Sequence, residues 1–291
     1  MKNNNDLRNK FQTNSLKYII DGDEFTVSVP AQTEFFVGDN VCLSKEFGDI
    51  TEKQSWYEQG FSIVNLEPFL DIGRTKVKLS ECISRICEEE GVAINRESFL
   101  LENYHKYVSE DKHSVILQRT RDLGPDDFGF DINKFLAAAE KYFKQDLSWE
   151  GSGEYNPRII ARINMPESEH FNPAHKDVYQ VFDKTDNIPE MVNIWIPVCG
   201  VNNGVGLPLS LGSHLICEDL VYRTKAGSTL NGKKYNVNCI KEWNSRHDLT
   251  TICPSENQMI VFSSFLIHGL ARNLHRDTTR ISLEFRLFGR N

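Results

Sequence analysis

Two histidines and one aspartate have the residue types and the spacing of a metal-binding set. His175 and Asp177 lie two positions apart, so on an extended segment their side chains project to the same side. His268 follows much later, in the β-like run 265–268, and a different strand can bring it to face the first pair. Two imidazoles and one carboxylate that leave other positions open are the ligands with which non-haem iron(II) activates oxygen. The spacing therefore predicts a metal centre assembled from two strands.

The His-x-Asp pattern is weak evidence when it is taken alone. In a chain of this composition roughly one His-x-(Asp/Glu) is expected by chance. A second copy, His275-Arg276-Asp277, lies in a predicted hairpin connection and has no later histidine to complete a set of three. A lone histidine is more often a hydrogen-bonded polar residue than a ligand, so for His175 alone that alternative stays open.

A guanidinium and a hydroxyl follow His268 on the last predicted strand. Arg280 and Ser282 are two residues apart and share the polar face of that strand. An arginine binds a carboxylate in bidentate fashion, and a neighbouring hydroxyl adds one more hydrogen bond. The far carboxylate of a 2-oxo diacid needs such a pair once its keto acid end has chelated iron. The alternative for Arg280 alone is a solvated strand arginine.

Alternating side chains give three predicted strands one apolar and one polar or aromatic face. In each strand the apolar positions recur at every second residue. One interpretation is an ordinary sandwich whose polar face lies in water. In the other, the apolar faces pack on helices and the polar faces line a barrel interior, which is costly unless the interior holds a ligand or metal. The apolar positions are Ile159, Ala161 and Ile163; Val192, Ile194, Ile196 and Val198; and Ile281, Leu283, Phe285 and Leu287.

The order of elements predicts an α+β fold in a single domain, 1–291. We expect a polar arm over 1–20 and edge strands within 24–37, so that 1–75 is a region of polar N-terminal arm and edge strands. Helices are expected over 76–90, from Ser98 and over 132–147, which makes 76–150 a supporting helical region. Short strands from 155 to 291 then form a sandwich or barrel with helices against one face. Residues 215–250 show little periodicity and are expected to be a lid insertion.

Composition excludes several classes of protein. Hydrophobic residues make up 40% and charged residues 25% of the 291 residues, which is typical of a globular chain. The net charge of −8 argues against nucleic acid and against an anionic membrane surface. No apolar run approaches the roughly 18 residues of a membrane span, and the polar start has no secretory signal. Seven scattered cysteines without a C-x-x-C make a disulfide framework or zinc ribbon a poor explanation and favour a cytoplasmic protein.

The sequence resembles the iron(II)/2-oxoglutarate-dependent dioxygenases, most closely their phytanoyl-CoA dioxygenase-like branch. The matching residues are His175-Lys176-Asp177, His268 and Arg280-Ile281-Ser282, and Asn203-Gly204 followed by Leu211-Gly212-Ser213-His214 resembles the N-G…G-S-H segment of that branch. The resemblance covers roughly 155–291. It implies a double-stranded β-helix, or jelly roll, with the N-terminal helices packed on one sheet.

The resemblance also implies roles for individual residues. His175, Asp177 and His268 would bind Fe(II), Arg280 would pair with the far carboxylate of 2-oxoglutarate, and Ser282 would assist it. With O2, such an enzyme oxidises its substrate and releases succinate and CO2. Related halogenases have a small residue where this chain has Asp177, so hydroxylation is favoured over halogenation. His214 is expected to be structural.

The alternation of strand side chains suggests further contacts. Asn164, Asn193 and Trp195 should face the cavity, where either asparagine could bond the cosubstrate and Trp195 could form a wall. Arg158, Arg162 and Arg286 would suit a small polar, even anionic, substrate if they point inward; the alternative places them in water at the barrel mouths. Two other functions stay open: a cupin-like metalloenzyme that does not use 2-oxoglutarate, and a non-catalytic jelly-roll binding module. No feature of the sequence predicts an oligomeric state.

Overall fold

A computed structural model describes residues 13–151, 158–168, 171–179, 188–202 and 204–290. Its larger sheet is antiparallel and has the strand order β3-β13-β6-β14-β4, with β5 also paired to β14. Strands β4 and β5 bond to different parts of the long strand β14. The bounds of these strands are Phe61–Asn65 (β3), Leu147–Ser148 (β4), Ile160–Asn164 (β5), Met191–Cys199 (β6), Gln258–Ser263 (β13) and Arg280–Gly289 (β14).

The smaller sheet has the strand order β2-β1-β12-β7. Within it, β1 and β12 run parallel, although they come from opposite ends of the chain. Beyond β7 the sheet continues through two isolated bridges, which pair Leu209 with His268 and His268 with His175. The strand bounds are Thr13–Ile20 (β1), Asp23–Pro30 (β2), Leu207–Leu209 (β7) and Asp248–Ile252 (β12).

The chain alternates between the two sheets, and this alternation makes the fold jelly-roll-like. From β5 in the larger sheet it passes to His175 in the smaller, then to β6 in the larger and β7 in the smaller. After β12 it repeats the pattern through β13, His268 and β14. Side chains from the two sheets meet in one apolar cluster, to which the larger sheet contributes Trp195, Ile260 and Phe262 and the smaller Leu207 and Leu209.

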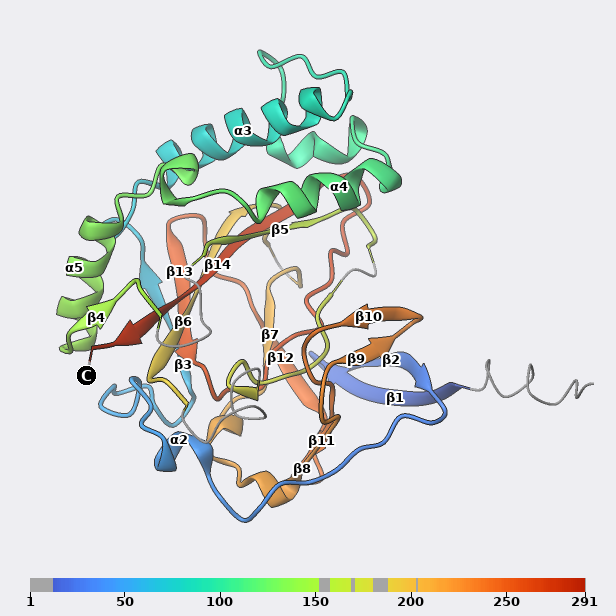
Figure 1. Ribbon diagram of the computed structural model, residues 1–291, viewed down its shortest axis with the longest axis vertical. Coiled ribbons are helices and arrows are strands. Elements are labelled where there is room, and N and C mark those ends of the chain that lie inside the picture. Colours follow the sequence, from blue (N-terminus) through green and yellow to red (C-terminus); the bar gives the residue numbers. More distant parts are fainter. Residues whose placement is uncertain (1–12, 152–157, 169–170, 180–187, 203, 291) are drawn as a thin grey trace, which may run out of the picture.

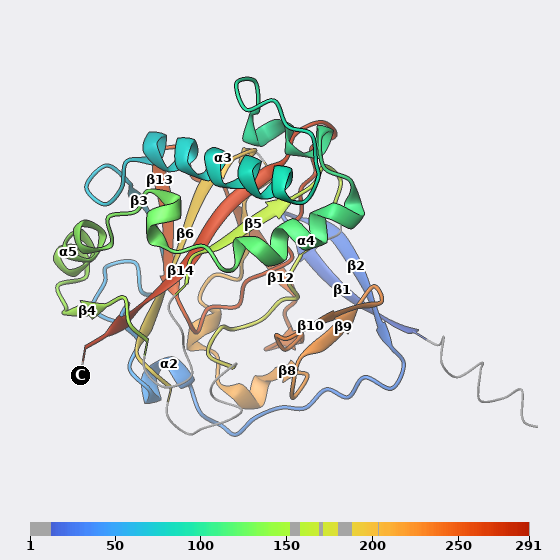
Figure 2. The same ribbon diagram turned by 45° about the horizontal axis from the view of Figure 1, so that its top comes forward.

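Three helices cover the other face of the larger sheet (Figures 1 and 2). They are α3 (Ile72–Glu89), α4 (Glu110–Thr120) and α5 (Ile132–Phe143). Helices α3 and α5 begin after Asp71 and Asp131, whose side chains accept the backbone N–H bonds of Arg74 and Lys134. Their apolar stripes share one cluster with the apolar faces of β5, β6 and β14, and the rings of Phe135 and Phe285 meet edge to face at 5.1 Å.

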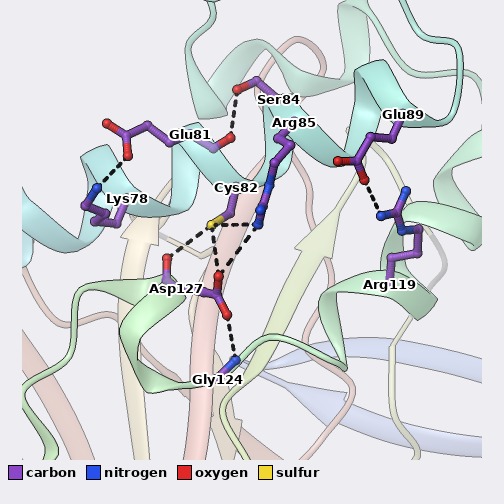
Figure 3. Close-up of polar contacts among 9 residues, drawn as sticks. All are labelled: Lys78, Glu81, Cys82, Ser84, Arg85, Glu89, Arg119, Gly124 and Asp127. Carbon is purple, nitrogen blue, oxygen red and sulfur yellow. Dashed lines mark hydrogen bonds and ion pairs between the residues drawn. The ribbon is translucent and has the colours of Figure 1, made fainter.

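Polar contacts join α3 to its neighbours (Figure 3). The Cys82 thiol donates to the Asp127 carbonyl at 3.3 Å, and Arg85 lies 3.6 Å from the Asp127 carboxylate. Asp127 belongs to the short 3-10 helix η3 (Pro125–Phe128). Arg119 of α4 forms an ion pair with Glu89 near the end of α3. These contacts hold the helical layer together at its outer surface.

The helix expected from Ser98 is wrong. Ser98 does not cap a helix there, because its hydroxyl donates to the Asn95 carbonyl at 3.4 Å. Only a 3-10 helix, η2 (Leu101–Lys106), forms in this region, and the α-helix α4 begins later, at Glu110. Alternation of buried Leu16, Tyr18 and Ile20 likewise gives strand β1 over part of the expected arm. Residues 1–12 lie outside the described residues.

The segment 215–250 is built from short elements rather than from an irregular loop. It contains the 3-10 helix η5 (Glu218–Leu220), two antiparallel strand pairs and the start of β12. Cys239, Ile240 and Trp243 in this segment are buried in a second apolar cluster with Tyr18 of β1. The pairs are β8 (Val221–Arg223) with β11 (Ile240–Trp243) and, between them in the chain, the hairpin of β9 (Ser228–Leu230) with β10 (Lys233–Tyr235). The remaining short helices are α2 (Leu43–Glu46) and η4 (Ser213–Leu215).

Two general features complete the fold. Across the described ranges, every helix is too short or too polar to cross a membrane. All seven cysteines are free thiols.

Candidate metal centre

His175 and His268 form the middle of the site because their backbones pair directly. The His175 N–H donates to the His268 carbonyl at 2.9 Å, and the His268 N–H donates to the His175 carbonyl at 3.0 Å. Their ring centroids are 4.3 Å apart. A backbone bridge between two segments distant in sequence thus places both imidazoles on the same side of the smaller sheet.

Each imidazole is oriented by a bond to a nearby carbonyl. His175 Nδ1 bonds to the Pro173 carbonyl at 2.7 Å, and His268 Nδ1 bonds to the Leu266 carbonyl at 3.0 Å. Since a carbonyl only accepts, Nδ1 carries the proton in each neutral ring and Nε2 keeps its lone pair. Such a bond fixes the tautomer and the direction of a metal-binding histidine.

Asp177 completes a compact, buried group of three. Its Oδ1 lies 3.5 Å from His175 Nε2, and its Oδ2 lies 3.7 Å from His268 Nε2. One ligand atom from each residue can be chosen so that all three lie within 4.8 Å of one another. The structure therefore brings together the three residues that spacing singled out, in an arrangement that can hold a metal ion.

The charges of this group suit a cation. Burial and the neighbouring His175 lower the pKa of His268 to about 4, so its ring is neutral at neutral pH. Burial raises the pKa of Asp177, but Arg286, His268 and His175 outweigh it and hold the pKa well below its usual range. A neutral imidazole and an ionised carboxylate are the forms in which these side chains bind metals.

Arg286 reaches the site from β14 and bonds to the metal-binding carboxylate. Its Nη2 lies 2.6 Å from Asp177 Oδ1, and its Nε donates to Oδ2 at 3.3 Å. The sequence suggested that Arg286 contacts substrate. In the structure it points inward and neutralises Asp177.

Arg280 is a buried cation whose two terminal nitrogens bond to neutral oxygens. Its Nη1 donates to Asn164 Oδ1 at 2.7 Å and its Nη2 donates to the Gly206 carbonyl at 2.9 Å. Only 1% of Arg280 is exposed, and burial lowers its pKa to about 10, which still leaves it charged at neutral pH. No carboxylate of the described residues forms an ion pair with Arg280, and a buried charge without a countercharge is costly, so this environment favours an anionic ligand.

Four buried polar atoms near Arg280 and Arg286 lack a hydrogen-bond partner among the described residues. They share the inner face of the larger sheet, because Ser282 pairs with Pro197, Glu284 with Trp195, and Arg286 with Asn193. The Trp195 ring lies 5.3 Å from the Arg280 guanidinium carbon. These atoms are Arg280 Nε, Ser282 Oγ, Trp195 Nε1 and Asn193 Nδ2. A group of unpaired donors beside a metal set fits a cosubstrate that carries carboxylates.

The other suggested residues each have surroundings of their own. Arg162 forms an ion pair with Glu284 at 2.8 Å, and both are part-exposed. Arg158 is exposed, as in the alternative that places it in water at a barrel mouth. His214 is buried, with its ring 4.9 Å from that of Tyr57. Asn203 lies outside the described residues.

Sequence reasoning missed Gly269, which makes the histidine bridge possible. Its φ is +136°, and a Cβ built there would lie 2.1 Å from the Pro173 carbonyl oxygen. Only glycine therefore permits this approach of the two backbones. The position directly after His268 was the one available signal, since glycine is common where two chains approach closely.

Comparisons with known proteins find likeness only among solved structures. No protein-family model matches this sequence, and no curated protein matches it. The apo form of the non-heme monooxygenase ThoJ is 17% identical, with 83% of this chain and 77% of that chain covered and a TM-score of 0.44. EctD from S. alaskensis, solved with 2-oxoglutarate and 5-hydroxyectoine, is 11% identical, with 89% and 84% covered and a TM-score of 0.45. The epimerase SnoN, in complex with Fe3+, alpha ketoglutarate and nogalamycin RO, is 12% identical, with 80% of each chain covered and a TM-score of 0.41.

Proposed function

We propose that this protein is an iron(II)- and 2-oxoglutarate-dependent oxygenase. The observation that supports this most directly is the buried group His175, Asp177 and His268, whose ligand atoms lie within 4.8 Å of one another. The inner face of the larger sheet carries the buried cation Arg280, whose Nε is unpaired among the described residues, and the same face carries Arg286, which bonds to Asp177. A metal set and a separate carboxylate-binding cation are what a metal-chelating diacid needs.

In this proposal each residue has a simple task. His175, Asp177 and His268 hold Fe(II), and their bonds to carbonyls and to Arg286 fix the direction of the ligand atoms. When bound, iron and 2-oxoglutarate supply the oxidising chemistry, in which O2 is consumed and succinate and CO2 are released. Arg280 and Ser282 bind the far carboxylate, and Asn164 or Asn193 bonds to the cosubstrate. The burial of His175, Asp177 and His268 limits the access of water to the reacting atoms.

The proposed reaction is hydroxylation of a small polar metabolite. Asp177 occupies the carboxylate position, which favours hydroxylation over halogenation. Trp195, Arg162, Arg158 and Arg286 are the proposed substrate contacts, and the positive charge of the three arginines suits an anionic group. The segment 215–250 is the proposed lid, and the phytanoyl-CoA dioxygenase-like branch is the proposed place of this chain among such enzymes.

Anaerobic titration tests the proposal. Chelator-treated protein is loaded with Fe(II) and then titrated with 2-oxoglutarate, and a weak visible metal-to-ligand charge-transfer band is expected. His175→Ala should abolish the band, while the exposed variant Lys17→Met should keep it. If folded protein binds Fe(II) but shows no band, a metalloenzyme without 2-oxoglutarate is favoured. If it binds no metal, the binding-module alternative gains support.

A further inference from the structure

The residue between the two metal-binding residues of the His-x-Asp motif has a partner of its own. Lys176 is 1% exposed, and its ammonium donates to Glu218 Oε1 at 2.7 Å. Glu218 is 2% exposed and lies in η5, at the start of the segment 215–250. Neighbouring side chains on an extended segment point to opposite sides. Lys176 therefore anchors the motif from the side opposite to its two metal-binding residues.

Two further side chains complete a buried cluster around Glu218. The Tyr179 hydroxyl donates to Glu218 Oε2 at 2.7 Å, and Arg223 Nε lies 3.9 Å from the same oxygen. The Arg223 guanidinium also stacks between two rings, 3.9 Å from the centroid of Tyr179 and 4.7 Å from that of Phe36. We call Lys176, Tyr179, Glu218 and Arg223 the Glu218 cluster.

The backbone of Glu218 is held as firmly as its side chain. Its N–H donates to the Val41 carbonyl at 2.9 Å, and its carbonyl accepts from the Gly38 N–H at 3.0 Å. A Cβ at Gly38 would lie 2.8 Å from Glu218 Cβ, so the segment around Gly38 packs directly on this residue. The backbone position of Glu218 is therefore held by contacts that do not involve Lys176.

We propose that the Lys176–Glu218 pair positions the metal-binding motif and couples metal binding to the order of residues 215–223. A buried ion pair gives little net stability compared with an apolar pair of similar size, so stability alone is a poor reason for this cluster. The geometric effect of the pair is specific. At one end it fixes the backbone of Lys176, between His175 and Asp177, and at the other end it holds Glu218 in the proposed lid. Because coupling between two sites is reciprocal, metal binding should stabilise the segment that carries Glu218.

This inference rests on the metal-binding part of the proposed function. It requires no 2-oxoglutarate and no particular substrate. The probe is therefore Co(II) alone, added to the chelator-treated full-length protein, with binding followed by its visible ligand-field bands. If the wild-type protein binds no Co(II), the proposed function fails. If the wild type binds it, the variants below decide the positioning role separately.

Three variants distinguish positioning from a merely structural role. Lys176→Met should weaken Co(II) binding at least tenfold and lower the melting temperature, because it leaves Glu218 buried with a weaker partner. The double variant Lys176→Met/Glu218→Met removes the unmatched carboxylate but also takes it from Tyr179 and Arg223, so it should recover only part of the melting temperature and keep the tenfold loss of Co(II) affinity. Lys17→Met breaks an exposed pair with Glu24 and serves as the matched control, with no change in either quantity. Recovery of both quantities in the double variant, or wild-type Co(II) affinity in Lys176→Met, would overturn the proposal.

Hydrogen exchange on the wild-type protein provides a test that needs no folded variant. Saturation with Co(II) should slow amide exchange in 215–223, the segment that holds Glu218 and Arg223. The β9–β10 hairpin, 228–235, belongs to the same insertion but contributes no member of the Glu218 cluster, so its exchange should not change. Equal exchange in 215–223 with and without Co(II) would contradict the coupling.

Discussion

At the scale of single residues, the charge of Asp177 decides what the site can bind. A buried carboxylate is costly, and here Arg286 lies within 2.6 Å of it while the imidazoles of His175 and His268 flank its oxygens. The combined effect keeps the pKa of Asp177 well below its usual range although burial alone would raise it. A divalent cation bound by His175, Asp177 and His268 would add positive charge next to the ionised Asp177 carboxylate. Arg286 thus serves the metal-binding carboxylate whether or not it also contacts a substrate.

Arg280 is the residue on which binding of 2-oxoglutarate should depend. Arg280→Met removes the charge and the guanidinium fork, so we expect the 2-oxoglutarate dissociation constant to rise about 100-fold, which is ~2.7 kcal/mol. Arg280→Lys should recover only part of this loss, because an ammonium is a point charge without the planar fork. The charge-transfer band of the Fe(II) protein, titrated anaerobically with 2-oxoglutarate, gives both constants.

Arg158→Gln is the matched control for Arg280. Arg158 lies just before β5, the strand that pairs with β14 of Arg280, but it is exposed, so its removal should leave the 2-oxoglutarate constant unchanged. Unchanged binding in Arg280→Met, or an equal loss in Arg158→Gln, would mean that the carboxylate is held elsewhere.

The metal-binding residues could be predicted from the sequence because metal chemistry restricts both residue type and spacing. His175, Asp177 and His268 satisfy that restriction, and the structure places their ligand atoms together. Glu218 and Gly269 could not be predicted in the same way. Glu218 has no fixed spacing to Lys176, and Gly269 matters only because the Pro173 carbonyl approaches it in the folded chain.

At the scale of elements, the site depends on a backbone bridge between two short segments. Neither segment is a long strand, and their pairing consists of the reciprocal bonds between His175 and His268. The bridge is extended by Gly269, whose N–H donates to the Pro208 carbonyl at 3.2 Å. Small changes in the distance between these backbones should therefore move both imidazoles.

Gly269→Ala tests how strongly the metal centre depends on this bridge. The new Cβ would meet the Pro173 carbonyl oxygen at 2.1 Å, so the two backbones must separate. We expect a loss of more than about 2 kcal/mol in the free energy of unfolding and at least tenfold weaker Co(II) binding. Chemical denaturation and Co(II) titration measure the two effects.

Gly232→Ala is a control that separates the effect of the steric clash at position 269 from the effect of a positive φ alone. Gly232 also has a positive φ, of +77°, but a Cβ there meets nothing within 4 Å. It should cost only about 1 kcal/mol of stability and leave Co(II) affinity unchanged. Equal Co(II) affinity in the two variants would argue against the bridge as the determinant of the site.

Elements with a clear period could be predicted, and elements without one could not. The apolar positions of β5, β6 and β14 alternate along each strand, and the structure buries them together against the helices. Helix α4 was missed because two of its three buried residues, His113 and Thr120, are polar. Strands of three residues, such as β8 and β9, are too short for an alternation to appear in the sequence.

At the scale of the whole molecule, the larger sheet separates the stabilising core from the chemistry. Its outer face packs on α3, α4 and α5 in the largest apolar cluster (Figure 2). Its inner face carries Arg280, Ser282 and Asn193 toward the smaller sheet. The parallel pairing of β1 with β12 joins the N-terminal strands to the rest of the smaller sheet. This pairing could not be predicted, because the sequence of neither strand specifies a partner so distant in the chain.

This separation predicts that the helical layer contributes stability without affecting the metal centre. Phe135→Ala removes a fully buried ring that contacts Phe69, Phe130 and Phe285, so we expect a loss of about 3–5 kcal/mol in the free energy of unfolding. Co(II) affinity of the protein that remains folded should be unchanged. Val77→Ala, on the exposed side of α3, should change stability by less than about 0.5 kcal/mol. Weaker Co(II) binding in Phe135→Ala would show that the two faces are coupled.

Acid should destabilise the metal-free protein well before its carboxylates titrate. Burial lowers the pKa of both His268 and His214 to about 4, whereas in the unfolded chain a histidine titrates near its ordinary 6.5. Between pH 6.5 and about 4 the unfolded state binds more protons than the folded state. The stability that comes from keeping the two histidines neutral is therefore complete above pH 6.5 and is lost as the pH falls through about 4. Near pH 5 the difference approaches two protons, or about 2.7 kcal/mol per pH unit. Asp49, whose pKa is raised by burial, acts in the opposite direction at the acid end.

The pH dependence can be assigned to these two rings. Urea denaturation of chelator-treated protein at several pH values from 7.5 to 5 gives the slope, and His214→Gln should reduce it by about one proton. Co(II) binds only the neutral form of His268, so saturation with Co(II) should steepen the fall in stability as the pH decreases. A free energy of unfolding that stays constant from pH 6.5 to 5 would mean that these imidazoles accept protons as readily in the folded protein as in water. In that case the dry, neutral surroundings that the metal centre requires would be absent.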